Sequence, residues 1–249
     1  MSVRSIGLTL LLAFALAGTS AAAAQQTHWF IIGDSWGALI GPTQEAKLQE
    51  LGLNYPFTNL AVGGTTAEQW AEDQFGLLSG ATSALSALPA QDSAIVYVSL
   101  GGNDFLGEFA DQGAAIFLRI RDDLAIIVAE LLAAKPETTI LLGGYDILNF
   151  EKSLLCELIA LGIVGTSEPE GMNRLVGVGQ RLLLDVAPEE SRVLPVPVIG
   201  ALQGSPRQPD LSSWSPAELI TPDCIHLTPE GYDIFNDAMF DLLGATVAD

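Results

Sequence analysis

Short runs of apolar residues alternate along the chain with longer stretches in which apolar side chains recur every three or four positions. Short runs are typical of buried β-strands, and the longer spacing is typical of amphipathic helices. The short runs cover His28–Gly33, Phe57–Val62, Ala94–Leu100, Thr138–Gly143 and Val193–Ile199. The helical spacing covers Trp36–Leu51, Thr65–Leu78, Ile116–Ala134, Asn173–Val186 and a last helix from Thr228 to about Leu243. This alternation predicts a parallel sheet with helices on both faces.

Two long segments interrupt the alternation. Residues Asp146–Met172 begin with a long apolar stretch and continue into a polar loop, whereas Gly204–Pro222 is rich in Pro and Ser and contains Trp214. Segments of this length inside a folded domain are typical of lids, binding loops or disorder. Pro195 and Pro197 in the fifth run predict an edge strand, because proline cannot donate a hydrogen bond to a neighbouring strand.

The first 24 residues have the pattern of a signal peptide. Arg4 supplies a positive charge, Ile6–Ala17 is apolar, and Ala21–Ala24 offers the small residues that precede a cleavage site. The apolar run is shorter than the roughly 20 residues that span a bilayer, which disfavours the alternative of a retained anchor. We therefore expect residues 1–24 to be removed on export to the periplasm or the medium. Residues 25–249 are then expected to form one domain.

The charge balance excludes several kinds of partner. The chain has 10 Lys and Arg against 30 Asp and Glu, a formal charge of −20, and removal of Arg4 would leave 10 − 1 = 9 basic residues and a charge of −21. Nucleic acids are bound by cationic groups that displace counterions from phosphates, so no nucleic-acid partner is expected. Anionic membrane surfaces are disfavoured for the same reason.

The first candidate for chemistry is Ser35, in the sequence Gly33-Asp34-Ser35 at the end of the first predicted strand. The carboxyl ends of parallel strands are where α/β proteins bind ligands. Ser35 also opens a predicted helix, where backbone N–H groups and the helix dipole favour negative charge. The alternative for this serine is a plain helix cap.

The second candidate is the pair Asp223 and His226, just before the last predicted helix. A serine hydroxyl is a poor nucleophile until a base accepts its proton, and imidazole suits that role near neutral pH. A carboxylate three residues earlier on a loop can bind the other imidazole nitrogen and fix its orientation. The only other histidine, His28, opens a predicted strand at its amino end, on the wrong edge of the sheet. The alternative for His226 is an ordinary surface histidine.

Two further segments offer donors for a developing oxyanion. Residues 59–64 follow the second predicted strand and end in Gly63 and Gly64, whose backbone can approach a substrate closely. Asn103 follows the third predicted strand and offers a side-chain amide. Preorganised N–H donors of this kind lower the barrier to acyl transfer. Each segment alone is a common turn, but both fall at carboxyl ends of strands, as Ser35 does.

At these residues the chain resembles the SGNH/GDSL hydrolase family. The four blocks of the family appear in order as FIIGDSWGAL, NLAVGGTTAEQW, SLGGNDFL and DCIHLTPEGY, starting at residues 30, 59, 99 and 223. The resemblance implies a flavodoxin-like three-layer α/β/α fold with a five-stranded parallel sheet. It also implies an ester hydrolase that uses no cofactor and no metal. Where the name-giving pattern has leucine, this chain has Trp36, which affects the fit of the substrate more than the chemistry.

The resemblance also implies roles for individual residues. Ser35 corresponds to the nucleophile, His226 to its base and Asp223 to the carboxylate that orients the base. The oxyanion hole is formed by the Ser35 N–H, Gly64 and Asn103, with Gly63 as an alternative to Gly64. The pattern G-x-S-x-G around Ser35 also fits α/β-hydrolases. In that fold, however, several strands precede the serine and the acid lies on a separate, earlier loop.

Several substrates are compatible with this chemistry. Apolar side chains that could line an acyl pocket favour acyl esters or thioesters, including lipid esters: Trp36, Phe105, Leu106, Tyr145, Trp214 and the stretch Ile147–Val164. Side chains of this kind more often pack in the core than contact a ligand. An alternative is removal of O-acetyl groups from a glycan, and a non-enzymatic alternative is a catalytically silent protein that binds lipid or glycan. The sequence does not decide the oligomeric state.

The two cysteines, Cys156 and Cys224, predict a disulfide. They are the only cysteines of the chain, and export implies an oxidising compartment in which disulfides persist. Their spacing is not that of a zinc site. The strand order 2-1-3-4-5 would bring the segment after the fourth strand close to the loop that holds Cys224. The alternative is two separate buried thiols.

Overall fold

A computed structural model of the chain describes residues 25–186 and 192–247. The predicted signal peptide, residues 1–24, lies outside the described residues. Within the described ranges no helix is long and apolar enough to cross a membrane.

Five parallel strands form one sheet in the order β2-β1-β3-β4-β5, which confirms the predicted flavodoxin-like topology. The strands are β1 (Thr27–Gly33), β2 (Phe57–Asn59), β3 (Ser93–Ser99), β4 (Thr138–Gly143) and β5 (Val193–Val196). β2 ends before the predicted Val62, because the Asn59 side chain accepts the Ala61 N–H and starts a turn. β5 lies at the predicted edge and ends just before Pro197.

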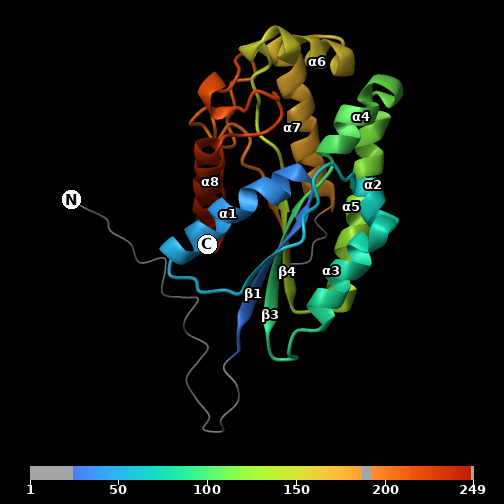
Figure 1. The fold of residues 1–249 in the computed structure, drawn as a ribbon, viewed down its shortest axis with the longest axis vertical. Coiled ribbons are helices and arrows are strands. Elements are labelled where there is room, and N and C mark those ends of the chain that lie inside the picture. Colours follow the sequence, from blue (N-terminus) through green and yellow to red (C-terminus); the bar gives the residue numbers. More distant parts are fainter. Residues whose placement is uncertain (1–24, 187–191, 248–249) are drawn as a thin grey trace, which may run out of the picture.

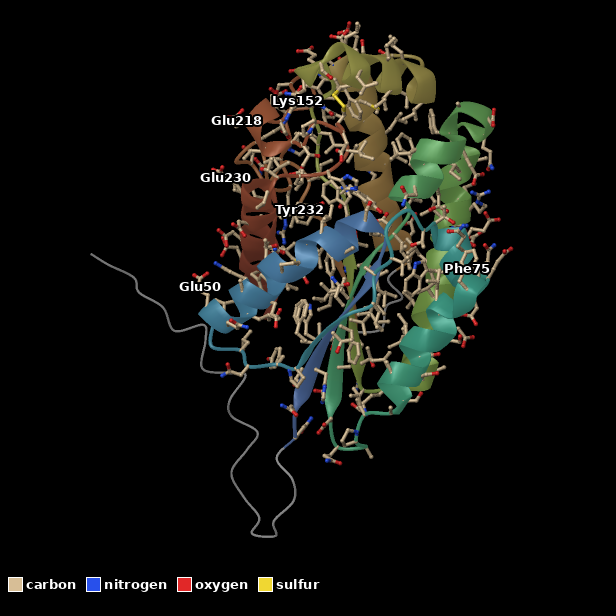
Figure 2. The ribbon with its side chains drawn as sticks, in the orientation of Figure 1. Glu50, Phe75, Lys152, Glu218, Glu230 and Tyr232 are labelled. Carbon is tan, nitrogen blue, oxygen red and sulfur yellow. A yellow bond between two sulfur atoms is a disulfide. The ribbon has the colours of Figure 1, made fainter. Side chains whose placement is uncertain are left out.

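Helices cover both faces of the sheet, which gives three layers (Figure 1). One face is covered by α1 (Ser35–Glu50) and α8 (Pro229–Val247), and the other by α2 (Ala67–Ala71), α3 (Leu77–Ser86), α5 (Ala115–Ala134) and α7 (Pro169–Val186). Successive β1 side chains alternate between the two cores. Trp29 and Ile31 pack toward α1 and α8, while Phe30 and Ile32 pack toward the other layer. Side chains fill the space between the layers (Figure 2).

Three helical details differ from the predictions. The helix predicted over Thr65–Leu78 is interrupted by a short 3-10 turn, η2 (Gln74–Gly76), because Asp73 and Phe75 have positive φ angles of 54° and 58°. Helix α4 (Gly102–Gln112) is not among the helices predicted from the apolar spacing. Helix α7 begins four residues before the predicted Asn173.

The two interrupting segments lie beyond the carboxyl ends of the strands. Asp146–Met172 contains a 3-10 turn, η3 (Phe150–Lys152), and α6 (Leu154–Val164), and it continues into α7. Figure 1 shows α6 across the top of the molecule, close to α4 and α7. Gly204–Pro222 is mostly loop with one 3-10 turn, η4 (Ala217–Leu219), and it leads into the segment that carries Asp223 and His226.

Candidate active site

Ser35 is the first residue of α1, directly after β1. Asp34 caps the helix, because its Oδ1 accepts the Trp36 N–H at 2.8 Å. β1 and β3 approach closely at this point: a Cβ added to Gly33 would lie 2.5 Å from the Ser99 carbonyl oxygen, so only glycine fits there. The turn between β1 and α1 thus holds the serine at the carboxyl edge of the sheet.

The structure brings Ser35, His226 and Asp223 into one hydrogen-bonded chain. His226 Nε2 lies 2.7 Å from Ser35 Oγ, and His226 Nδ1 lies 2.7 Å from Asp223 Oδ2. These distances are those of a nucleophile, its base and the group that orients the base.

The carboxylate of Asp223 is held by several donors. Its Oδ1 accepts hydrogen bonds from the Thr221 hydroxyl at 2.6 Å and from the backbone N–H groups of Ile225 and His226. Partial burial alone would raise the pKa of Asp223, but these donors and the His226 ring outweigh burial and hold its pKa below the ordinary value. Asp223 is therefore ionised at neutral pH and can stabilise an imidazolium.

His28, the other histidine of the chain, lies at the opposite end of β1. Its Nε2 is 3.1 Å from Asp92 Oδ2, at the amino edge of the sheet. His28 therefore lies at the edge of the sheet where the sequence placed it, away from Ser35.

The two segments expected to supply oxyanion donors meet beside Ser35. A Cβ added to Gly63 would lie 3.8 Å from Ser35 Cβ, and Gly64 has a φ angle of +81°, which favours glycine. Asn103 Nδ2 donates to the Thr65 carbonyl oxygen at 2.9 Å. Asp104 adds a second hydrogen bond between the same two segments, because its buried carboxylate accepts the Ala67 N–H at 2.8 Å.

A buried network around Asp34 joins three loops of the site. The Tyr145 hydroxyl donates to Asp34 Oδ2 at 2.5 Å and accepts the Gly102 N–H at 2.8 Å. Burial raises the pKa of Asp34 to about 6, although the hydrogen bonds from Tyr145 and Trp36 oppose that rise. Tyr145 follows β4, so this network connects the nucleophile loop, the start of α4 and the end of the fourth strand.

Trp36 braces the loop that carries the histidine. Its Nε1 donates to the Ile225 carbonyl oxygen at 2.8 Å, one residue before His226. Its ring makes edge-on contacts with Tyr145 at 5.2 Å and Tyr232 at 5.7 Å between ring centroids. Trp36 was expected to affect substrate fit or to pack in the core, and its hydrogen bond to Ile225 could not be predicted because it joins residues 189 positions apart.

An apolar pocket opens beside Ser35 and His226, with a volume of about 120 Å³. It extends between the sheet edge, α4, α5 and α7. Its apolar walls include Phe105, Leu106, Phe117, Ile120, Leu124, Leu175, Val176, Leu182 and Leu183. Few polar groups line it, so the pocket suits an apolar chain better than a sugar.

Of the five single side chains proposed for an acyl pocket, four line this one: Trp36, Phe105, Leu106 and Tyr145. Trp214 lies outside the wall, because it packs edge-on against Phe150 at a centroid distance of 5.7 Å in a small apolar cluster with the two cysteines. Of the stretch Ile147–Val164, Leu148 and Phe150 line the pocket, whereas the residues of α6 do not.

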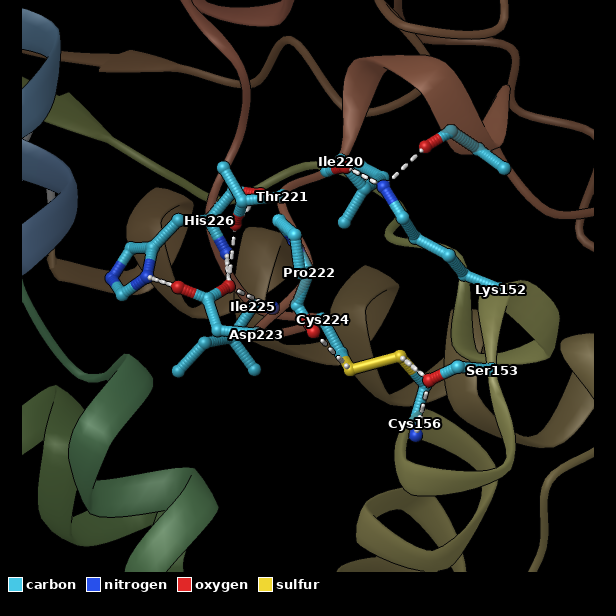
Figure 3. The surroundings of a disulfide bond; sticks show 11 residues. Lys152, Ser153, Cys156, Ile220, Thr221, Pro222, Asp223, Cys224, Ile225 and His226 are labelled. Carbon is cyan, nitrogen blue, oxygen red and sulfur yellow. Dashed lines mark hydrogen bonds and ion pairs between the residues drawn. A yellow bond between two sulfur atoms is a disulfide. The ribbon is translucent and has the colours of Figure 1, made fainter.

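A disulfide joins Cys156 in α6 to Cys224, which lies between Asp223 and His226 (Figure 3). Cys224 has a φ angle of +75°, a left-handed conformation that is uncommon for a residue other than glycine. Lys152, just before α6, adds a second connection: its Nζ donates to the carbonyl oxygens of Ala217, at 2.8 Å, and Ile220. The loop that carries Asp223 and His226 is therefore fastened to α6.

No group of three or more His, Cys, Asp or Glu side chains in the described ranges is arranged to hold a metal ion. The polar groups closest to Ser35 include His226 and Asp223, the network around Asp34, and Asn103. Together these groups can support acyl transfer, with a serine hydroxyl as the attacking group and an imidazole that accepts and returns its proton.

Comparisons with known proteins identify the family of the chain and agree with its fold. Residues 28–234 match the GDSL-like lipase/acylhydrolase family. A comparison with curated sequences gives no match. Similar solved structures include TesA, with 20% identity over 88% of this chain and 98% of the other and a TM-score of 0.54. The acetyl xylan esterase AlAXEase has 13% identity over 86% and 99%, with a TM-score of 0.52. The psychrotrophic esterase EstA from Pseudoalteromonas has 14% identity over 90% and 100%, with a TM-score of 0.51.

Proposed function

The chain belongs to the GDSL-like lipase/acylhydrolase family of ester hydrolases, and we propose that it is an exported serine hydrolase with Ser35 as nucleophile. The observation that carries the proposal is the hydrogen-bonded chain from Asp223 through His226 to Ser35, with 2.7 Å at each step. A serine hydroxyl becomes a competent nucleophile in this arrangement because the imidazole can accept its proton.

The reaction proceeds in two acyl transfers. Ser35 Oγ attacks the ester carbonyl carbon while its proton passes to His226 Nε2, and Asp223 stabilises the imidazolium. The tetrahedral intermediate collapses, the ester C–O bond breaks, and His226 gives its proton to the leaving alcohol. Water then attacks the acyl-enzyme with His226 as base, which releases the acid and restores the Ser35 hydroxyl.

The developing oxyanion is stabilised by the Ser35 N–H, the Gly64 N–H and the Asn103 amide. Gly63 remains the alternative to Gly64, because it lies beside Ser35. An amide nitrogen carries two N–H groups, so Asn103 can hold the Thr65 carbonyl oxygen with one and offer the other to substrate. The contact with Thr65 preorganises this donor, which is what makes such groups effective.

The apolar pocket favours an acyl chain as the part of the substrate that is recognised. Its volume of about 120 Å³ is slightly below the roughly 150 Å³ of an engineered apolar cavity that binds benzene. A chain of on the order of six carbon atoms would fill it. Removal of acetyl groups from a glycan is the second candidate, because a structural neighbour is an acetyl xylan esterase.

A panel of soluble esters from acetyl to long-chain tests the proposal. Each methylene buried in the pocket contributes about 0.8 kcal/mol, or about fourfold, so kcat/KM should rise by about 10²-fold from acetyl to hexanoyl. A flat or falling profile would favour the deacetylase alternative. The variant His226→Ala should abolish turnover, whereas His28→Ala, at the other end of β1, should keep it. If both variants remained active, the proposed triad would be wrong.

Export and the domain limits belong to the same proposal. We infer that residues 1–24 are cleaved and that residues 25–249 act as one domain in the periplasm or the medium. The sequence pattern of Arg4, the apolar run and Ala21–Ala24 supports this. The intact mass of protein recovered outside the cytoplasm should correspond to a chain that starts near Gln25, and a chain that still starts at Met1 would contradict it.

A further inference from the structure

Helix α6 exposes a row of leucines to solvent. The exposed fractions are 70% for Leu154, 59% for Leu155, 56% for Leu158 and 46% for Leu161. With 3.6 residues per turn, these four positions project from the same side of the helix. We call these four residues the leucine face.

The opposite side of α6 explains why the helix stays in place without burying the leucine face. Cys156 and Ala160 on that side are fully buried in a small cluster with Phe150, Met172 and Cys224. A surface helix normally buries its apolar side and exposes its polar side. Helix α6 is apolar on both sides, with Glu157 as its only charged residue, so the leucine face leaves apolar side chains open to solvent in the described part of the chain.

Helix α6, which carries the leucine face, lies beside the active-site pocket. Phe150 just before α6 and Met172 in α7 both line the pocket and pack against the buried side of α6. Helix α6 also contacts α4, which supplies Phe105 to the pocket wall. The disulfide and the Lys152 hydrogen bonds fasten α6 to the loop of His226 (Figure 3). The helix that carries the leucine face is thus fastened beside the candidate active site.

The charges around α6 restrict what can cover the leucine face. The nearby charged residues in the sequence are mostly acidic: Glu151, Glu157, Glu168 and Glu170. The nearby cations are Lys152, whose ammonium group is occupied by carbonyl oxygens, and Arg174, which pairs with Glu170. The whole chain carries a formal charge of −20. An anionic surface would therefore be repelled, whereas an uncharged or zwitterionic apolar phase would not.

We propose that the leucine face docks the enzyme on the surface of a neutral lipid aggregate that contains its ester substrate. This rests on the proposed function, because the aggregate would supply the acyl chain that enters the pocket. Apolar side chains set at the boundary of an acyl phase gain free energy by leaving water, as they do in interfacial helices. An acyl chain would then pass from one apolar environment into another beside Ser35.

Co-sedimentation with phosphatidylcholine vesicles tests the proposal. All proteins carry Ser35→Ala, so that the vesicles stay intact and binding does not depend on turnover. The parent should bind, and its binding should weaken when phosphatidylserine is added. Replacing Leu154, Leu155 and Leu158 by serine should lower the partition coefficient at least 100-fold, at about tenfold for each leucine removed from the apolar phase.

Phe75→Ser is the matched control. Phe75 is the most exposed large apolar side chain described, at 86%, and Figure 2 shows it far from Lys152 and α6. Its loss should leave vesicle binding unchanged. In the active background, the triple leucine variant should hydrolyse a soluble short-chain ester with kcat/KM within about twofold of the parent, which also shows that it is folded.

Two results would overturn the proposal. The first is equal vesicle binding by the parent and the triple variant, including no binding by either. The second is a parent dimer in solution that the triple variant converts to a monomer, because the leucine face would then be an interface between two copies of the chain. Failure of the proposed function would show separately, as absence of soluble-ester hydrolysis in the active background.

Discussion

Replacing Tyr145 by phenylalanine removes one oxygen atom from the centre of the buried network. That oxygen donates to Asp34 Oδ2 at 2.5 Å and accepts the Gly102 N–H at 2.8 Å. The phenyl ring can keep the contact with Trp36, so the packing of the site is preserved. The substitution therefore isolates the contribution of the two hydrogen bonds.

The expected loss of stability in Tyr145→Phe follows from these two hydrogen bonds. A hydrogen bond to a charged group contributes roughly 1.5–3 kcal/mol, and leaving the Gly102 N–H unpaired costs about 1–3 kcal/mol if water does not replace the oxygen. We expect a loss of about 3 kcal/mol in the free energy of unfolding at pH 8. For a domain of this size each kcal/mol corresponds to roughly 2–4 °C, so Tm should fall by about 6–12 °C.

The loss of stability in Tyr145→Phe should be larger at high pH than at low pH. Burial raises the pKa of Asp34 from 3.8 in the unfolded chain to about 6 in the folded protein. Protonated Asp34 therefore contributes its full stability below pH 3.8, and this contribution is lost as pH rises through about 6. The Tyr145 hydroxyl lowers that pKa by stabilising the carboxylate. Without it the pKa rises further, so the variant should lose more stability relative to the parent at pH 8 than at pH 5.

Thermal unfolding of parent and variant at pH 5 and pH 8 measures this effect. Tyr55→Phe is the control, because its hydroxyl lies outside the Asp34 network and its removal should leave the difference between the two pH values unchanged. A fall in Tm below about 2 °C at both pH values would show that the network contributes little. An equal fall at both values would show that Asp34 does not titrate in this range.

Three other changes test the oxyanion donor, the acyl pocket and the disulfide separately. Asn103→Ala should lower kcat by roughly 10²–10³-fold on soluble esters, whereas a change in KM alone would make Asn103 a positioning residue. Gly179→Leu should lower kcat/KM for hexanoyl esters at least tenfold and spare acetyl esters, because Gly179 lines the pocket with open space above it. The control Gly177→Leu lies outside the lining and should change kcat/KM for neither ester. Equal effects of the two substitutions would place the acyl chain elsewhere. Changing both Cys156 and Cys224 to serine should lower the free energy of unfolding by about 2–4 kcal/mol for a loop of 68 residues and lower kcat, while unchanged values for both would make the link unimportant.

The sheet could be predicted from the sequence because its strands are short apolar runs bounded by turns. The prediction failed where local backbone geometry or tertiary contacts decide the structure. Positive φ angles at Asp73 and Phe75 break a segment whose apolar spacing reads as one helix. Helix α4 follows its N-cap residue Gly101, which has a φ angle of +106°, in a segment whose sequence is typical of a glycine-rich turn.

The candidate site could be located because each of its residues follows a strand or precedes the last helix. The contacts that fix these residues were not visible in the sequence. The Trp36 contact with Ile225 and the Tyr145 contact with Asp34 join positions far apart in the chain, and no local pattern encodes them. For Trp214 the sequence signalled only an aromatic residue in a loop, and the structure packs it behind Phe150.

The most direct test of the central claim is covalent labelling of the purified protein with a fluorophosphonate. If Ser35 is the nucleophile, one equivalent of label should add to the peptide that contains Ser35 while hydrolysis stops, and Ser35→Ala should neither take up label nor turn over ester. Label on another residue together with lost activity, or continued hydrolysis by Ser35→Ala within tenfold of the parent, would contradict the account.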